Sequence, residues 1–147
     1  MPDYPGRPFH VAPGWVKPGA LHHVRIRANA SNPMPLTARV IATALLTAAR
    51  EYHESARWYC QLLLLMPDHL HALLAFPADK EMSKIIGAWK GFQAKKLGVS
   101  WQANYFDHRI RNDAEAEEKA AYIRQNPVVK GLCVHKEHWP WVYEGNR

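Results

Sequence analysis

Two histidines stand one residue apart in the segment MPDHLHALLAFP, residues 66–77. Side chains on a strand alternate between its faces, so His69 and His71 would point to the same side, roughly 6 to 7 Å apart. Two imidazoles at that separation can bind one cation and would supply half of a metal site. The pair is also compatible with a solvated sheet face or with hydrogen-bonded core residues. Structural zinc is disfavoured, because it takes four ligands, and Cys60 and Cys133 form no recognisable pair.

A second candidate pair lies in the segment EEKAAYIRQNP, residues 117–127, where Tyr122 and Asn126 are one helical turn apart. The packing stripe expected for this helix consists of Ala116, Ala120 and Ile123. Tyr122 falls outside that stripe, so it is either a surface tyrosine or a group placed for chemistry. The Asn126 amide oxygen can bind a hard cation, although an asparagine before proline commonly just ends a helix. Spacing alone leaves both roles open.

The hydrophobic pattern predicts the elements that position these residues. Residues 21–30 alternate apolar and basic side chains, which is typical of a half-buried strand. An amphipathic helix follows between Leu36 and Tyr52. Residues 58–66 and 69–76 are then expected to form two strands of a hairpin that turns at Pro67 and Asp68.

The second half of the chain is expected to contain two more helices and a short strand. Asp79 is a candidate N-cap for a helix that ends at Gly98. The apolar stripe expected on that helix consists of Met82, Ile85, Ile86, Trp89, Phe92 and Leu97. Residues 104–110 predict a fourth strand. Asn112 or Asp113 would then begin a last helix, which Pro127 is expected to stop.

The expected element order is therefore strand, helix, strand, strand, helix, strand, helix. This βαββαβα pattern predicts an α+β fold of the ferredoxin-like or RRM-like type, an antiparallel sheet with helices packed mainly on one face. Residues 1–20 are rich in proline and glycine and are expected to form an N-terminal extension, and residues 21–147 a single domain. Fold class does not by itself decide function.

Composition and charge give expectations for the binding partner and the cellular location of the protein. The 147 residues include 19 Lys and Arg and 13 Asp and Glu, and the net charge of +6 weakly favours a polyanionic partner. The sequence shows neither a signal peptide nor an apolar run long enough to span a membrane. The two cysteines lack the spacing of a disulfide framework. These features predict a soluble, cytoplasmic protein without a membrane partner.

Three segments that follow one another in the chain give a more specific indication. They are MPDHLHALL, WQANYFDHRIRN and AAYIRQNPVVKGL, followed by the basic, tryptophan-containing HKEHWPWVY. Together they resemble the single-tyrosine transposases with a His-hydrophobic-His signature, and among these the REP-associated tyrosine transposases. The resemblance runs from about Leu21 to Tyr143. Two departures from the family are the N-terminal extension and the short stretch after the last tryptophans, where some relatives carry a longer tail.

The resemblance implies that residues 21–147 are a transposase-like catalytic domain that cuts and rejoins single-stranded DNA carrying a hairpin. By the same resemblance, Tyr122 is the nucleophile, and His69, His71 and Asn126 hold a divalent cation, expected to be Mg²⁺ or Mn²⁺. The products would be a 5′-phosphotyrosine and a free 3′-OH. Glu118 shares the face of Tyr122 and is a candidate general base, although a first-turn glutamate usually serves the helix dipole.

Basic and aromatic side chains are candidates for DNA contact. The basic candidates are Arg25, Arg27, Arg109 and Arg111, on two strands expected to be neighbours beside the histidines, and Lys84 and Lys95, on the second long helix. Gly87 and Gly91 lie between these lysines and would either admit a phosphate backbone or pack closely on the sheet. Trp101, Tyr105 and Phe106 could stack unpaired bases, although aromatic side chains are more commonly buried.

Two other functions are compatible with the same sequence. A non-catalytic RRM-like module would bind single-stranded nucleic acid through its sheet and aromatic side chains, without needing His69, His71 or Tyr122. A metal-dependent hydrolase would activate water at the histidine pair and leave no protein linked to DNA. The oligomeric state is open between a monomer and a homodimer.

Overall fold

The structure is a computed structural model that describes residues 21–145 of the chain, so the expected N-terminal extension, residues 1–20, lies outside the described residues. Five strands form one antiparallel sheet in the order β4-β1-β3-β2-β5. The strands are β1 (His22–Arg27), β2 (Tyr59–Leu65), β3 (His69–Ala75), β4 (Phe106–Arg109) and β5 (Val142–Glu144).

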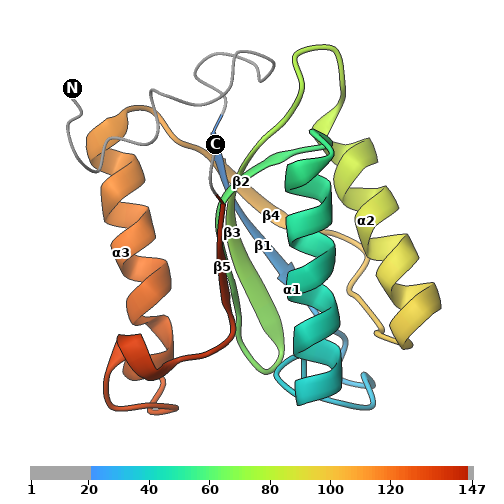
Figure 1. Cartoon of the computed structure of the whole chain (residues 1–147), viewed down its shortest axis with the longest axis vertical. Coiled ribbons are helices and arrows are strands. Elements are labelled where there is room, and N and C mark those ends of the chain that lie inside the picture. Colours follow the sequence, from blue (N-terminus) through green and yellow to red (C-terminus); the bar gives the residue numbers. More distant parts are fainter. Residues whose placement is uncertain (1–20, 146–147) are drawn as a thin grey trace.

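Three α-helices flank this sheet, and a short 3-10 helix follows the last of them. The helices are α1 (Arg39–Glu54), α2 (Met82–Leu97), α3 (Asp113–Val129) and the 3-10 helix η2 (Lys136–His138). Figure 1 shows α1 and α2 on one side of the sheet and α3 on the other. The expected α+β fold is confirmed, and two of the three α-helices share a face as expected. α3 covers the opposite face.

Alternate residues of β3 belong to two separate cores, and the apolar residues of β1 belong to one of them. Val24 and Leu70 pack in the core under α1 and α2, whereas Leu73 packs against residues of α3. Because side chains alternate along a strand, the residues of β3 that share the face of Leu73 include His69 and His71. The histidine pair therefore lies on the face covered by α3.

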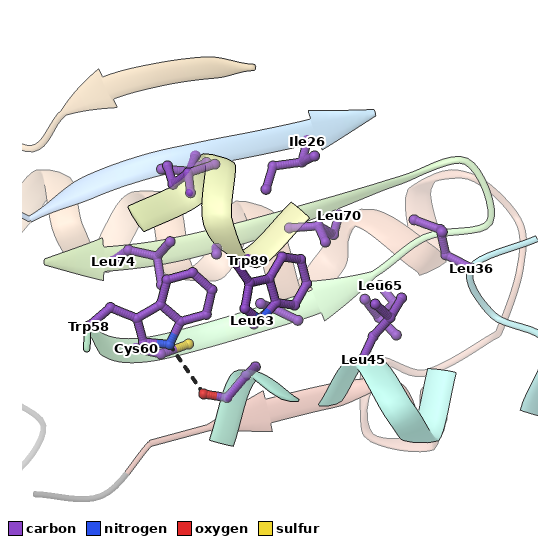
Figure 2. Packing of buried hydrophobic residues seen from close by; sticks show 14 of the residues in the cluster. Ile26, Leu36, Leu45, Trp58, Cys60, Leu63, Leu65, Leu70, Leu74 and Trp89 are labelled. Carbon is purple, nitrogen blue, oxygen red and sulfur yellow. Dashed lines mark hydrogen bonds between the residues drawn. The ribbon is translucent and has the colours of Figure 1, made fainter. Parts of the chain in front are cut away.

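The larger core lies between the sheet and helices α1 and α2 (Figure 2). Trp58 and Trp89 are enclosed there, with ring centroids 5.5 Å apart. The Trp58 Nε1–H donates to the Ala49 carbonyl at 3.2 Å, so burial of this indole leaves no unpaired donor. This core holds the sheet on which the candidate site is built.

The smaller core fixes α3 on the other face. Its helical part is the stripe predicted from the sequence, Ala116, Ala120 and Ile123. The helix begins at Asn112, whose Oδ1 accepts a hydrogen bond from the Glu115 backbone N–H at 2.8 Å. The sequence-based expectation for the start and the packed side of this helix is therefore confirmed.

The hairpin turn determines where β3 begins. The Met66 backbone N–H donates to the His69 carbonyl at 2.8 Å, which closes the turn at Pro67 and Asp68 as the sequence predicts. Because the turn is this tight, β3 starts at His69 itself.

The structure contains one strand that the sequence pattern did not predict. β5 has three residues and pairs with residues 62–64 of β2. Three residues are too few to display alternation, and Pro140 stands just before the strand. Val142 and Tyr143 favour a strand locally, and pairing with the edge of β2 completes it.

The start and the apolar stripe expected for α2 are partly wrong. Glu81 rather than Asp79 occupies the N-cap, because a turn at residues 77–80 precedes the helix. Phe92 is 60% exposed. Lys90 is buried on the packed side instead, and its Nζ donates to the Gln102 carbonyl at 2.8 Å.

The end expected for α3 is also wrong, since Pro127 lies inside the helix and the helix continues to Val129. Inside a helix, proline removes one N–H donor and its ring crowds the carbonyl four residues earlier, but Pro127 lies close to the C-terminal end of α3. The Lys130 N–H still donates to the Asn126 carbonyl at 3.0 Å, so helical hydrogen bonding resumes past the proline.

Candidate active site

His69 and His71 lie side by side on the face of β3 that α3 covers. They are 8% and 2% exposed, and their ring centroids are 4.9 Å apart. In the neighbouring strand β1, Arg27 pairs with His69 and Arg25 pairs with His71. Directly opposite residues of antiparallel strands share a face, so both arginine side chains leave the sheet beside the imidazoles. The expectation that the two histidines point the same way is confirmed.

Tyr122 comes to this histidine pair from α3. Its ring centroid lies 5.8 Å from that of His71 and 6.4 Å from that of His23, both in edge-to-face arrangement. The tyrosine is 53% exposed, so its ring packs on the histidines while part of the side chain stays open to solvent. Two residues far apart in the sequence thus meet on one face of the sheet.

Asn126 follows one turn later on α3 and is 4% exposed. Among residues 21–145, its Oδ1 atom is buried without a hydrogen-bond partner. A buried polar atom without a partner costs about 1 to 3 kcal/mol, so binding of a ligand to this oxygen would remove that cost. An amide oxygen suits a hard cation, and imidazoles suit borderline metals. The donor set of Asn126, His69 and His71 therefore fits a divalent cation.

The direction of α3 agrees with this grouping. Figure 1 shows α3 beside the β2–β3 hairpin, with the C-terminal end of the helix at the same end of the molecule as the hairpin turn. Asn126 lies C-terminal to Tyr122, and β3 begins at the turn with His69. The amide is therefore nearer than Tyr122 to the end of the sheet where His69 lies.

The Nδ1 atom of each histidine of the pair already has a partner. Asp68 Oδ1 lies 2.7 Å from Nδ1 of His69, and His23 Nε2 lies 3.0 Å from Nδ1 of His71. Each Nε2 atom is therefore the nitrogen left to bind a cation. A second ring nitrogen held by a hydrogen bond is the usual arrangement around metal-binding histidines.

Burial keeps these imidazoles neutral. Burial lowers the pKa of His71 to about 3 and the pKa of His23 to about 4, and neighbouring positive groups act in the same direction. The pKa of His69 is also lowered, mainly by burial, against the opposing effect of Asp68. Neutral imidazole is the form that binds a metal, so none of the three rings must lose a proton near pH 7.

Within residues 21–145, no group of three or more His, Cys, Asp or Glu side chains is arranged to hold a metal ion. A cation at this site would therefore depend on the Asn126 amide as well as on two imidazoles. Three protein ligands leave coordination positions for water or for phosphate oxygens, which is typical of a catalytic rather than a structural metal site.

His23 is the residue of this cluster that the sequence analysis missed. It lies on β1, is 5% exposed and contacts His71 directly. The sequence signal was its position on the basic side of residues 21–30. That signal was not sufficient, because the pairing of β1 with β3 cannot be read from the alternation of either strand alone.

Comparison with known proteins decides the family. The family described as "Transposase IS200 like" matches residues 21–126, which include the paired histidines, Tyr122 and Asn126. The chain belongs to this transposase family. The membership agrees with the resemblance seen in the sequence.

Two curated relatives match this IS200-like transposase over part of its length. A relative from Haemophilus influenzae is 25% identical over 96 residues, which cover 54% of each chain. The REP-associated tyrosine transposase of Escherichia coli K12 is 27% identical over 84 residues, which cover 53% of this chain and 49% of the relative. The chain thus spans about half the length of the curated relatives that it matches.

The fold of this IS200-like transposase is also found in a solved structure, described as a REP-associated tyrosine transposase bound to a REP hairpin. The TM-score is 0.73 at 20% identity, and the match covers 87% of this chain and 78% of the other. At this identity the likeness shows the shared fold.

A groove lies next to the histidines of this IS200-like transposase. Its volume is about 350 Å³, and it is lined by Arg25, Arg27, Gln102, Asn104, Tyr105 and Phe106. The Arg25 guanidinium lies 4.9 Å from the centre of the Phe106 ring, and Phe106 is 43% exposed. Trp101 differs from these aromatics, because its Nε1–H donates to the Lys90 carbonyl and ties it to α2.

The structure separates the four arginines that the sequence predicts as one patch. β1 and β4 are neighbours as expected, but Arg109 pairs with His22. Arg109 therefore lies on the face of the sheet opposite to Arg25. Arg111 lies past the end of β4, where its guanidinium contacts Glu115 at 3.3 Å. The expectation that all four lie beside the histidines is wrong for these two.

The remaining predicted site residues lie on helices. Lys84 and Lys95 are exposed on α2, which covers the opposite sheet face from the histidines. A Cβ added at Gly87 or Gly91 would meet nothing within 4 Å, so these glycines are not needed for close packing on the sheet. Glu118 is exposed on α3, one turn before Tyr122.

None of the helices in the described part of this IS200-like transposase is long and apolar enough to cross a membrane.

Proposed function

We propose that this chain cuts and rejoins single-stranded DNA next to a hairpin, with Tyr122 as the nucleophile. The contact of Tyr122 with His71, at a ring separation of 5.8 Å, is the observation that carries the proposal. The partnerless, buried Oδ1 of Asn126 one turn later supports a cation beside the tyrosine. Membership in the IS200-like transposase family supports the reaction class.

The proposed reaction transfers a phosphodiester linkage to the protein. The Tyr122 phenol oxygen attacks the phosphorus and forms a new P–O bond, while the bond from phosphorus to the 3′ oxygen breaks. The phenol proton goes to a base, for which Glu118 is the candidate, and the departing 3′ oxygen gains a proton to become a 3′-OH. A second 3′-OH can then attack the phosphotyrosine and reseal a strand, which requires no nucleotide cofactor.

The protein side chains around the tyrosine prepare it for this attack. Tyr122 packs against His71 and His23, which restricts the position of its ring. His69, His71 and Asn126 would hold Mg²⁺ or Mn²⁺, which supplies charge neutralisation at the scissile phosphate when bound. Arg25 and Arg27 lie beside the histidines and would hold neighbouring phosphates.

The proposed substrate is a single strand that carries a hairpin. The structural relative described as bound to a REP hairpin supports this choice. The groove with Arg25 and the exposed Phe106 ring suits an unpaired nucleotide, because stacking on an aromatic side chain contributes about 1 to 3 kcal/mol per base. Contacts of DNA with Arg109, Arg111, Lys84 or Lys95 stay a prediction. A cytoplasmic location stays a prediction, as does a monomer or a homodimer as the acting form.

Trapping the covalent intermediate tests the proposal. Hairpin oligonucleotides labelled at the 5′ or the 3′ end are incubated with the protein and Mn²⁺, and denaturing gels then separate free from protein-linked DNA. We expect the 3′ label to migrate with the protein and the 5′ label to leave on a fragment with a 3′-OH. The Tyr122→Phe variant should bind the oligonucleotide like the wild type and form no adduct. Tyr52→Phe, on α1 under the other sheet face, is the matched control and should form the adduct.

Each other outcome contradicts the proposal in a different way. Cleavage without any adduct would indicate a hydrolase that uses water. Binding without cleavage, in the wild type and in both variants, would indicate a non-catalytic module. An adduct that persists in Tyr122→Phe would assign the nucleophile to another residue.

A further inference from the structure

His23 contacts both a proposed metal ligand, His71, and the proposed nucleophile, Tyr122. Its Nε2 atom lies 3.0 Å from Nδ1 of His71, and its ring also packs edge-to-face against Tyr122 at 6.4 Å. It is buried, and it reaches this position from β1, a strand that carries none of the proposed metal ligands. The proposed function uses it only as a packing surface for the Tyr122 ring and does not account for its hydrogen bond to His71.

An N–H···N hydrogen bond between two neutral imidazoles has two possible directions. If His71 donates from Nδ1–H to His23, the Nε2 atom of His71 has a free lone pair and can bind a cation. If His23 donates instead, His71 carries its hydrogen on Nε2 and cannot act as a ligand. The direction of this one hydrogen bond therefore decides whether His71 can bind the cation.

His69 also requires an acceptor at its Nδ1 atom if its Nε2 atom is to bind the cation, and in its case the acceptor is a carboxylate. His69 has a carboxylate, Asp68, at its Nδ1, and an ionised carboxylate can only accept. Asp68 is exposed at the hairpin turn, whereas the environment of His71 Nδ1 is buried. A neutral imidazole acceptor avoids placing a charge there, since burial of an unpaired charge is costly.

We propose that His23 is a positioning residue: its Nε2 accepts a hydrogen bond from Nδ1–H of His71 and so leaves the Nε2 lone pair of His71 for the divalent cation. This inference rests on the cation site of the proposed function. His23 touches no substrate, and it acts through the orientation and the tautomer of His71.

The test measures cation binding without DNA. Mn²⁺ is titrated into the metal-free full-length protein, and free Mn²⁺ is followed by electron paramagnetic resonance. We expect His23→Phe, which keeps a ring but removes the acceptor, to weaken Mn²⁺ binding by about 10-fold to 100-fold. His23→Gln places an amide oxygen near the position of Nε2 and should recover binding to within a few-fold of the wild type. His22→Gln, the adjacent histidine on the opposite face, is the matched control and should bind like the wild type.

The rescue separates positioning from a merely structural role. Thermal unfolding in EDTA shows whether His23→Phe and His23→Gln are folded, and a loss of stability shared by both would not explain a difference in Mn²⁺ affinity. Equal Mn²⁺ affinity of His23→Phe and the wild type overturns the inference. Equally weak binding of His23→Phe and His23→Gln overturns it as well.

Nuclear magnetic resonance of the wild type decides the question even if no variant folds. With ¹⁵N-labelled histidine and saturating Mg²⁺, we expect the proton of this hydrogen bond on Nδ1 of His71, with a scalar coupling to Nε2 of His23. A proton on Nε2 of His23 would overturn the inference. Failure of the proposed function is seen separately, as absence of the phosphotyrosine adduct with intact Mn²⁺ binding. A wild type that binds neither Mn²⁺ nor Mg²⁺ would reject the cation site and this inference together.

Discussion

Glu115 Oε2 lies 2.7 Å from Nε2 of His108, and this contact joins the first turn of α3 to the edge strand β4. The other carboxylate oxygen of Glu115 accepts the Arg111 backbone N–H at 2.7 Å. Glu115 is 8% exposed, whereas the His108 side chain that it contacts is 38% exposed. The helix that carries Tyr122 is thereby anchored to the sheet at its start by a single carboxylate.

Acid should weaken this anchor. Hydrogen bonds from the Arg111 backbone, from His108 and from the Arg111 side chain lower the pKa of Glu115 from 4.5 to about 2. A carboxyl group with a lowered folded-state pKa stabilises the fold above its unfolded pKa, and that contribution is lost as the pH falls from about 4.5 toward 2. The midpoint temperature of thermal unfolding should therefore fall less steeply between pH 6 and pH 2.5 for Glu115→Gln than for the wild type. Exposed Glu117→Gln should keep the wild-type slope, and equal slopes for all three proteins would contradict the prediction.

Replacement of Asn126 by leucine should separate stability from cation binding. Leucine has a similar volume and removes a buried oxygen that lacks a partner, so the free energy of unfolding in EDTA should rise or stay within about 1 kcal/mol of the wild type. Mn²⁺ affinity should fall more than about tenfold, as measured by the same titration. Asn112→Ala, on the same helix, removes an N-cap and should lower stability by about 1 kcal/mol without changing Mn²⁺ binding. Unchanged Mn²⁺ affinity in Asn126→Leu would exclude the amide as a ligand.

Truncation of Ile123 should loosen α3 from the sheet. The side chain is fully buried in the smaller core, so Ile123→Ala removes apolar contacts and leaves a cavity, at a cost of about 2 to 5 kcal/mol in the free energy of unfolding. Urea denaturation measures this loss. Val129→Ala, at a side chain that is 73% exposed, should change stability by less than about 0.5 kcal/mol. A loss below 1 kcal/mol for Ile123→Ala would mean that other contacts hold the helix.

Two arginines on neighbouring strands should differ in their effect on DNA affinity. Arg25 lies on the histidine face, and Arg109 lies on the opposite face. Arg25→Ala should weaken binding of a single strand and lower the slope of log K against log salt by about 0.7, the value for one lost phosphate contact. Arg109→Ala should leave the slope unchanged if DNA binds only at the histidine face. An equal change in both variants would place DNA across the β4 edge.

Periodicity was sufficient to predict the parts of the site that belong to one element. Alternation along residues 69–76 placed His69 and His71 on one face, and the helical stripe ending in Ile123 placed Tyr122 off the packed side. Both expectations concern side chains whose relative direction depends only on local backbone geometry.

Relations between elements could not be predicted in the same way. A shift of one residue in strand register moves a side chain to the other face, which is why Arg109 was expected beside Arg25 and lies opposite to it. His23 became recognisable only once β1 was seen to pair with β3. The partnerless oxygen of Asn126 is a property of burial in the folded chain, which spacing along a helix does not reveal.

Tyr122 and the histidines come from one polypeptide, and only residues 110–112 separate β4 from α3. Such a short connection, together with the Glu115 anchor, gives the tyrosine helix little freedom to exchange with that of a second copy. We therefore predict that each polypeptide forms one complete centre from its own Tyr122 and histidines. A complementation experiment tests this prediction. A mixture of Tyr122→Phe and His71→Ala proteins should remain inactive, because the intact Tyr122 of one copy cannot reach the intact His71 of the other.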